Sequence, residues 1–177
     1  MPNELATLAP QILAALQQAK HVLLHCHVGP DEDSVGSALA MCHVLTDLGK
    51  RATVIGGDSP LHTSLKFLPG FETIVPKNFF EIDLGEFDLF ISLDSASLDR
   101  ISSKGEVIFP AGLQVINIDH HPTNPGFGQI NLVDSSFAAT SEMLYALFTE
   151  WKVQIMPEIA TCLFVGISGD TGHFKHN

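Results

Sequence analysis

The stretch from His25 to Ser37, HCHVGPDEDSVGS, constrains the fold and the chemistry of this chain more than any other. A short apolar run leads into it, Gly29-Pro30 turns the chain, and a helical pattern leads out. The stretch therefore predicts a strand, a tight loop and a helix. Within seven residues it holds three potential metal ligands: His27, Asp31 and Asp33. Burying two carboxylates so close together is costly unless a cation or a proton neutralises them, and a divalent metal ion is the simplest solution.

The acidic composition limits which partners such a loop can serve. The chain of 177 residues carries 20 Asp and Glu against 9 Lys and Arg, a formal net charge of −11. A surface that binds duplex nucleic acid needs the opposite balance, so we expect no duplex partner. If the substrate is a phosphate compound, metal ions rather than a basic patch must supply most of the positive charge.

Dispersed cysteines and the lack of long apolar segments indicate the compartment. Cys26, Cys42 and Cys162 fall in apolar segments, which is typical of reduced core thiols rather than of a disulfide framework. No run of about eighteen apolar residues occurs, and residues 1–20 lack the features of a secretory signal. We therefore expect a single-domain cytoplasmic protein that does not contact a membrane, and we leave homodimer formation open.

Apolar periodicity predicts strands that alternate with helices. Strands are expected at residues 22–24, 52–55, 87–93 and 114–118. Helices are expected at residues 10–20, with Pro10 in the first turn, and at 34–48, 139–151 and 157–167, with a weaker one at 61–67. This alternation predicts an α/β fold whose mostly parallel sheet carries helices on both faces.

Potential metal ligands end three of the expected strands: His27 to Asp33 after the first, Asp94 after the third, and Asp119-His120-His121 after the fourth. In a parallel sheet these carboxyl ends meet at one edge, where ligands bind. Asp170 is expected to join them from a loop. We therefore predict a metal site at the carboxyl ends of the strands.

The ligand types indicate which metal binds and which reaction follows. Carboxylates and imidazoles without a thiolate suit Mn²⁺ first, with Mg²⁺, Fe²⁺ and Co²⁺ as alternatives, and argue against structural zinc held by cysteine. Six ligands suit two ions that lie about 3.5–4 Å apart and share a carboxylate. Two such ions lower the pKa of a bridging water and stabilise a leaving oxygen, so the expected reaction is hydrolysis at phosphorus.

Each acidic residue also has an ordinary structural interpretation. Asp31, Asp33 and Asp94 could cap helices, and the Gly-Asp-Thr-Gly sequence around Asp170 is common in turns. The adjacent His120 and His121 after a buried strand are harder to explain in this way. Together, the residues favour the metal site.

Four motifs resemble, in order and spacing, those of the DHH phosphoesterases, and together they span most of the chain. They are His27-Val-Gly-Pro-Asp31-Glu-Asp33, Asp94, Asp119-His120-His121 and Gly169-Asp170-Thr171-Gly172. The run from Asn117 to Asn124, followed by Phe127-Gly128, is especially similar to the bacterial nanoRNase and pAp phosphatase branch, which includes cyclic-dinucleotide phosphodiesterases.

This resemblance implies a role for each matched residue. It assigns one ion to His27, Asp31 and Asp94, and the second to Asp33, Asp94, His120 and Asp170, so that Asp94 bridges the two. Asp119 is expected to orient His120, and His121 to face the scissile phosphate as a donor to its oxygens or to the leaving group. A metal-bridging hydroxide would be the nucleophile, without a covalent enzyme intermediate.

The resemblance implies hydrolysis of phosphoester bonds in small nucleotides: short single-stranded oligoribonucleotides, 3′-phosphoadenosine 5′-phosphate (pAp) or cyclic dinucleotides. Three alternatives are kept: a manganese-dependent inorganic pyrophosphatase, a RecJ-like single-strand exonuclease, and a non-catalytic metal-binding fragment. The exonuclease is disfavoured by the acidic balance. The fragment is kept because this branch carries a second, C-terminal substrate-binding domain, whereas residues 1–177 are expected to form the catalytic domain alone.

Overall fold

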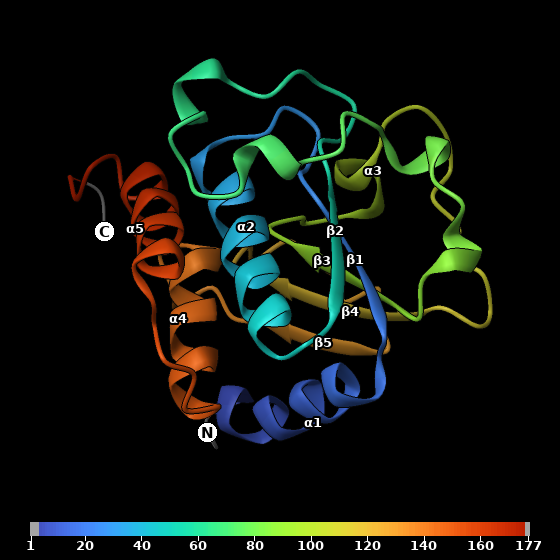
Figure 1. The fold of residues 1–177 in the computed structure, drawn as a ribbon, viewed down its shortest axis with the longest axis horizontal. Helices are drawn as coiled ribbons and strands as arrows, with labels where there is room; N and C mark the ends of the chain where they lie inside the picture. Colours follow the sequence, from blue (N-terminus) through green and yellow to red (C-terminus); the bar gives the residue numbers. More distant parts are fainter. Residues whose placement is uncertain (1–3, 176–177) are drawn as a thin grey trace.

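Five parallel strands form the centre of the fold, in the order β2-β1-β3-β4-β5 (Figure 1). The computed structural model describes residues 4–175 of the chain. The strands are β1 (His21–His25), β2 (Arg51–Ile55), β3 (Leu89–Leu93), β4 (Gln114–Asp119) and β5 (Ile130–Val133). The predicted α/β class and parallel sheet are thus confirmed. Because β1, β3 and β4 are neighbours, the loops that follow them meet at one edge of the sheet.

One face of the sheet is covered by the long helices: α1 (Glu4–Gln18), α2 (Glu32–Asp47), α4 (Thr140–Glu150) and α5 (Pro157–Asp170) (Figure 1). Their buried apolar side chains pack against alternate strand residues, including Leu24, Ile91 and Ile116. Side chains on a strand alternate between the two faces, so every second residue reaches this core. Among residues 4–175, no helix combines the length and the apolar character that a bilayer crossing requires.

The opposite face has a smaller core under short helical turns. Leu23, Phe90 and Val115 point to this side and pack against Phe79 and Ile101. The cover consists of α3 (Leu98–Ile101) and of residues in and beside the 3-10 turns η3 (Phe79–Glu81) and η4 (Leu84–Glu86), while η1 (Thr63–Leu65) and η2 (Phe71–Thr73) precede them in the chain. Helices therefore lie on both faces, but unequally. The weak helix expected at residues 61–67 is only the single turn η1.

The first helix differs from its predicted bounds. We expected Pro10 in the first turn, but Pro10 lies inside α1, which includes residues from Glu4 onward. An internal proline removes one backbone hydrogen bond. The additional turns bury Leu5 and Ala9 on the same side as Ile12, and this apolar contact offsets the lost bond.

The first turn of α2 lies directly against the last turns of α5. A Cβ atom on Gly36 would lie 2.6 Å from the carbonyl oxygen of Cys162, so only glycine allows this approach of two backbones. The approach continues to the helix ends, where Glu32 lies beside Gly169. Asp33 at the start of α2 and Asp170 at the end of α5 are thereby brought to the same place.

Candidate metal centre

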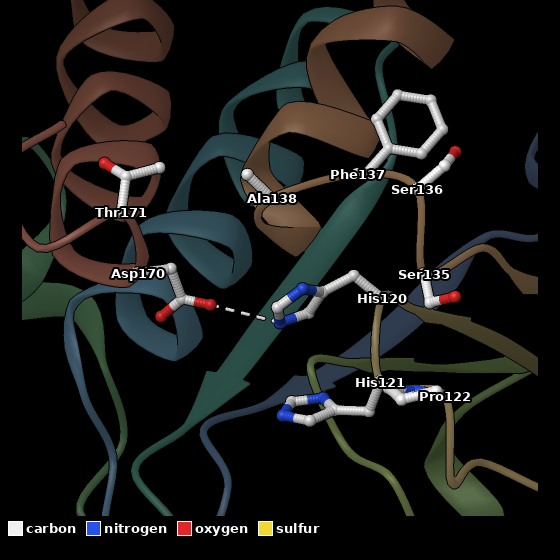
Figure 2. A pocket seen from close by; sticks show the side chains of 9 residues that line it. All are labelled: His120, His121, Pro122, Ser135, Ser136, Phe137, Ala138, Asp170 and Thr171. Carbon is white, nitrogen blue, oxygen red and sulfur yellow. Dashed lines mark ion pairs between the residues drawn. The ribbon is translucent and has the colours of Figure 1, made fainter. Parts of the chain in front are cut away.

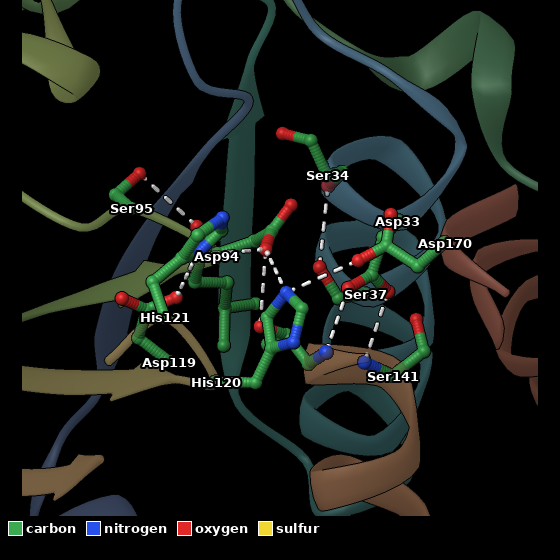
Figure 3. Close-up of polar contacts among 12 residues, drawn as sticks. Asp33, Ser34, Ser37, Asp94, Ser95, Asp119, His120, His121, Ser141 and Asp170 are labelled. Atoms are coloured by element: carbon green, nitrogen blue, oxygen red, sulfur yellow. Dashed lines mark hydrogen bonds and ion pairs between the residues drawn. The ribbon is translucent and has the colours of Figure 1, made fainter. Parts of the chain in front are cut away.

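The residues expected at the carboxyl edge meet there (Figure 3). His27 follows β1, Asp94 follows β3, and His120 follows β4. Asp170 joins them, but from the last residue of α5 rather than from the loop that we expected. The convergence of these groups at the strand ends is therefore as predicted, whereas the backbone setting of Asp170 is not.

The first cluster consists of His27, Asp31 and Asp94. Nε2 of His27 lies 3.3 Å from Oδ2 of Asp31 and 3.3 Å from Oδ2 of Asp94. The other oxygen of Asp31, Oδ1, accepts a 2.9 Å hydrogen bond from the backbone amide of Ser34 and so caps α2. The capping role considered for Asp31 is thus real, but it occupies only one carboxylate oxygen and leaves the other facing His27.

The second cluster consists of Asp33, Asp94, His120 and Asp170, whose ligand atoms all lie within 4.8 Å of one another. Nε2 of His120 lies 3.1 Å from Oδ2 of Asp170 and 3.5 Å from Oδ1 of Asp94. Asp94 therefore belongs to both clusters and presents a different oxygen to each. Its backbone φ of 55° lies in the left-handed region, which is unfavourable for a non-glycine residue and is often found at functional sites.

Asp33 is held by the first turn of α4. Its side chain is fully buried, and its two oxygens accept hydrogen bonds from the backbone amides of Thr140 and Ser141 at 2.6 Å and 2.9 Å. The hydroxyl of Thr140 also donates to Oδ1 of Asp94 at 3.2 Å. Burial and the charge of Asp94 nevertheless raise the pKa of Asp33 to about 8.

The two histidines that face these carboxylates bind protons strongly when no metal is present. Burial opposes the charge on His27, but hydrogen bonds to Asp31 and Asp94 outweigh it and raise its pKa to about 10. Burial likewise opposes the charge on His120, and its contacts with Asp170 and Asp94 raise its pKa to about 10. Burial alone would raise the pKa of Asp94, but His120 and His27 lower it well below its usual range.

Asp119 contacts a different histidine from the one we expected. Its Oδ1 accepts a 2.7 Å hydrogen bond from Nδ1 of His121, not from His120. The prediction was wrong because the Nε2 atom of His120 turns toward Asp94 and Asp170, while Nδ1 of His121 lies against Asp119. Asn124 donates to the other oxygen of Asp119 at 2.7 Å, so this carboxylate is held from two sides.

A cavity of about 460 Å³ opens beside the second cluster (Figure 2). In Figure 2, Asp170 and Thr171 at the end of α5 lie on the left, and His120, His121 and the loop between β5 and α4 lie to their right. The lining residues are His120, His121, Pro122, Ser135, Ser136, Phe137, Ala138, Asp170 and Thr171. Cavities of this size accept small molecules rather than a duplex.

Several residues that build this centre were not identified from the sequence. Thr140 and Ser141 hold Asp33, Asn124 holds Asp119, and Ser135 and Ser136 line the cavity. Backbone amides carry no sequence signal, so the support of Asp33 by α4 could not have been found. The polar run before the predicted helix at 139–151 was the only available sign of the cavity loop.

The donor atoms of both clusters fit divalent metal ions. Nε2 of His120 is buried and makes no hydrogen bond of good geometry, although two carboxylates surround it. An unpartnered imidazole nitrogen among carboxylate oxygens is what a metal ligand presents, and mixed oxygen and imidazole donors suit Mn²⁺ and related ions. The adjoining first cluster offers a second set of the same type.

A parallel α/β sheet with a carboxylate–imidazole metal centre at its carboxyl edge defines a class of metal-dependent proteins. Within that class, residues 21–167 match the N-terminal domain of the DHH family, and the chain belongs to this family. The family is metal-dependent, in agreement with the clusters found here.

Two curated relatives share a name. The chain is 37% identical over 171 residues to a bifunctional oligoribonuclease and PAP phosphatase NrnA from Thermus thermophilus, covering 95% of this chain and 48% of the relative. It is 31% identical over 158 residues to the protein of that name from Bacillus subtilis, covering 86% of this chain and 47% of the relative. The chain thus spans about half the length of these relatives.

A solved structure is also similar. It is the crystal structure of an exopolyphosphatase-related protein from Bacteroides fragilis, with a TM-score of 0.86 and 28% sequence identity. The alignment covers 96% of this chain and 52% of that chain. Nearly the whole of this chain therefore shares its fold with about half of an experimentally determined structure.

Proposed function

We propose that this chain hydrolyses phosphoester bonds in small nucleotides by means of two divalent metal ions, with Mn²⁺ as the first candidate. The observation that carries the proposal is the position of Asp94, which presents Oδ2 to His27 and Oδ1 to His120. A buried carboxylate shared between two ligand clusters would hold two ions close together, which suits two-ion hydrolysis.

The ligand sets follow from the two clusters. His27, Asp31 and Asp94 would hold one ion, and Asp33, Asp94, His120 and Asp170 would hold the other. Divalent ions bound there would lower the pKa of a bound water and stabilise charge on the attacked phosphate and on the leaving oxygen. The backbone amides that hold Asp33 in place would keep its carboxylate oriented for that task.

His121 would serve the leaving group. Its Nδ1–H donates a hydrogen bond to the buried carboxylate of Asp119, and its side chain is 43% exposed beside the cavity. Nε2 is therefore the nitrogen that remains to donate a proton or a hydrogen bond to a leaving oxygen. Because no ion is needed to position His121, its role is separable from metal binding.

The names of the relatives support the choice of substrate. Both are named for oligoribonuclease and PAP phosphatase activity, so pAp and short oligoribonucleotides are the substrates that we propose, with cyclic dinucleotides as a further candidate. The match to the N-terminal domain of the family supports residues 1–177 as a catalytic domain. A cytoplasmic location, the lack of duplex binding and homodimer formation stay predictions.

The test is to count bound Mn²⁺ per chain and to measure hydrolysis of pAp, a short oligoribonucleotide and pyrophosphate, with Mn²⁺ and with a chelator. We expect two ions and chelator-sensitive hydrolysis of pAp or the oligoribonucleotide. Hydrolysis of pyrophosphate alone would replace the proposal with a pyrophosphatase. Two bound ions with no hydrolysis would favour a non-catalytic metal-binding role, and no bound ion would overturn the metal centre itself.

A further inference from the structure

Arg100 lies beside the candidate metal centre. It is one of only two arginines in this acidic chain, the other being Arg51. Arg100 belongs to α3, which follows Asp94 closely along the chain, and its Nη2 atom lies 3.1 Å from Nδ1 of His27. A cation has thus been brought next to a histidine that faces two carboxylates, at the edge of the sheet where phosphate would bind.

The contact between Arg100 and His27 is not a productive hydrogen bond when His27 acts as a ligand. Nε2 of His27 faces the carboxylates, so the ring hydrogen of the neutral imidazole resides on Nδ1. That hydrogen has an acceptor in the carbonyl oxygen of Val28, 3.0 Å away. A guanidinium has only donors, so its N–H groups cannot be satisfied by Nδ1 and remain available.

Arg100 also lacks an acidic partner. Within residues 4–175 no carboxylate forms an ion pair with it, although the chain has 20 Asp and Glu. The nearby Asp31 and Asp94 pair with His27 instead. Burying half of a guanidinium without a paired anion costs free energy. An anion that enters the site and bonds to the guanidinium would offset this cost.

We propose that Arg100 binds a non-bridging oxygen of the phosphoryl group under attack. The proposal rests on the proposed function and adds to it a phosphate-binding residue on the side of the first cluster. The planar guanidinium matches the geometry of phosphate oxygens. Its positive charge would stabilise the negative charge on the phosphoryl oxygens, which the carboxylates of this centre repel. Arg100 thereby supplies the positive charge that the acidic surface lacks.

The side chain of Arg100 can be replaced without removing a contact that holds the fold. The link between α3 and the His27 loop is a 2.7 Å bond from the backbone amide of Val28 to the carbonyl oxygen of Arg100, and it does not involve the guanidinium. Arg51 provides a matched control, because it is exposed and begins β2 at the opposite, amino end of the sheet.

The experiment compares Arg100→Gln, Arg100→Lys and Arg51→Gln. For Arg100→Gln we expect kcat/KM for pAp to fall by about 10²–10³-fold, as when one donor to a developing charge is lost. The number of bound Mn²⁺ ions and the melting temperature should stay as in the unsubstituted chain. Arg100→Lys should recover part of the loss, and Arg51→Gln should behave like the unsubstituted chain.

A second measurement separates this inference from the proposed function. Calorimetry measures the affinity of the Mn²⁺-loaded protein for inorganic phosphate. This affinity should fall at least about 10-fold in Arg100→Gln, because one charged contact is lost. It should be unchanged in Arg51→Gln. If the unsubstituted chain hydrolyses no phosphoester but shows this pattern, the proposed function fails and the role of Arg100 stands. Unchanged phosphate affinity in Arg100→Gln, or loss of Mn²⁺ from it, would overturn the role of Arg100.

Discussion

Oδ1 of Asp119 lies 2.7 Å from Nδ1 of His121. The carboxylate is fully buried and can only accept, so Nδ1 carries a hydrogen and Nε2 is the nitrogen left for chemistry. Asn124 fixes the same carboxylate from its other oxygen. The pair thus sets both the orientation and the proton affinity of His121, one of the two histidines that line the cavity.

Replacing His121 should slow the reaction without removing metal. For His121→Ala we expect kcat to fall by about 10²–10⁴-fold, the usual contribution of a proton donor, with the Mn²⁺ content unchanged. The control is His62→Ala, at an exposed histidine whose ring has no partner in the described part of the chain. Because His121 also lies near Asp94 and His120, loss of an ion would instead assign it to the ligands.

Removing the charge of Asp119 should move the pH profile. The hydrogen bond with Asp119 is the main cause that raises the pKa of His121. In Asp119→Asn this pKa falls, so the protonated donor is lost at lower pH. We expect the basic limb of the kcat–pH profile to shift to lower pH, and a limb that stays in place would separate His121 from proton donation.

Asp94→Asn should abolish metal-dependent activity. The substitution keeps the size of the side chain but removes the charge that faces His27 and His120. We expect fewer bound Mn²⁺ ions and no detectable hydrolysis of pAp. Asp47→Asn, at an exposed carboxylate at the end of α2, is the matched control. Full activity in Asp94→Asn would contradict the assignment of two ions to one bridging carboxylate.

Metal binding should release protons. Without metal, the pKa values of His27 and His120 are raised to about 10 and that of Asp33 to about 8, so all three groups hold protons at pH 7. Ligands must lose these protons, so the affinity for Mn²⁺ rises with pH toward about 10. Calorimetry in buffers of different ionisation enthalpy should detect release of about three protons at pH 7. Binding without proton release would show that other groups hold the ions.

Gly166 should be intolerant of a side chain. A Cβ atom there would overlap the Ser141 hydroxyl and lie 2.7 Å from Oδ1 of Asp33. Gly166→Ala should therefore lower the free energy of unfolding by about 1–3 kcal/mol and weaken Mn²⁺ binding through Asp33. Gly112→Ala is the control, because nothing lies within 4 Å of its Cβ position. Denaturant unfolding measures both variants, and equal stability would contradict this packing.

The sequence predicted the sheet and its polar edge because both have local signals. The buried strands β1, β3 and β4 are mostly apolar, and Asp or His lies at or just beyond the carboxyl end of each. Strand β5 was not predicted, because Ile130–Val133 is short, contains Asn131 and buries only Leu132. Helices on both faces were predicted, but the individual turns that cover the second face were not, since single 3-10 turns leave no periodic pattern.

What could not be predicted about the centre depends on contacts between distant segments. The partner of Asp119 depends on how two adjacent rings turn, and the support of Asp33 comes from amides more than 100 residues away. The approach of Arg100 to His27 joins residues 73 positions apart. None of these pairs has a spacing rule that local patterns could reveal.

The candidate ligands come from four separate places: the loop and first turn after β1, the end of β3, the end of β4 and the end of α5. No short segment contains a complete set for two ions, so ions held by these ligands would bind the native chain far better than the unfolded one. Bound metal would therefore cross-link segments from the two ends of the domain, from His27 to Asp170. At a free Mn²⁺ concentration of about 100 times the dissociation constant, one such site would raise the free energy of unfolding by about 2.7 kcal/mol. Chelation would thus expose the chain to proteolysis as well as stop its chemistry.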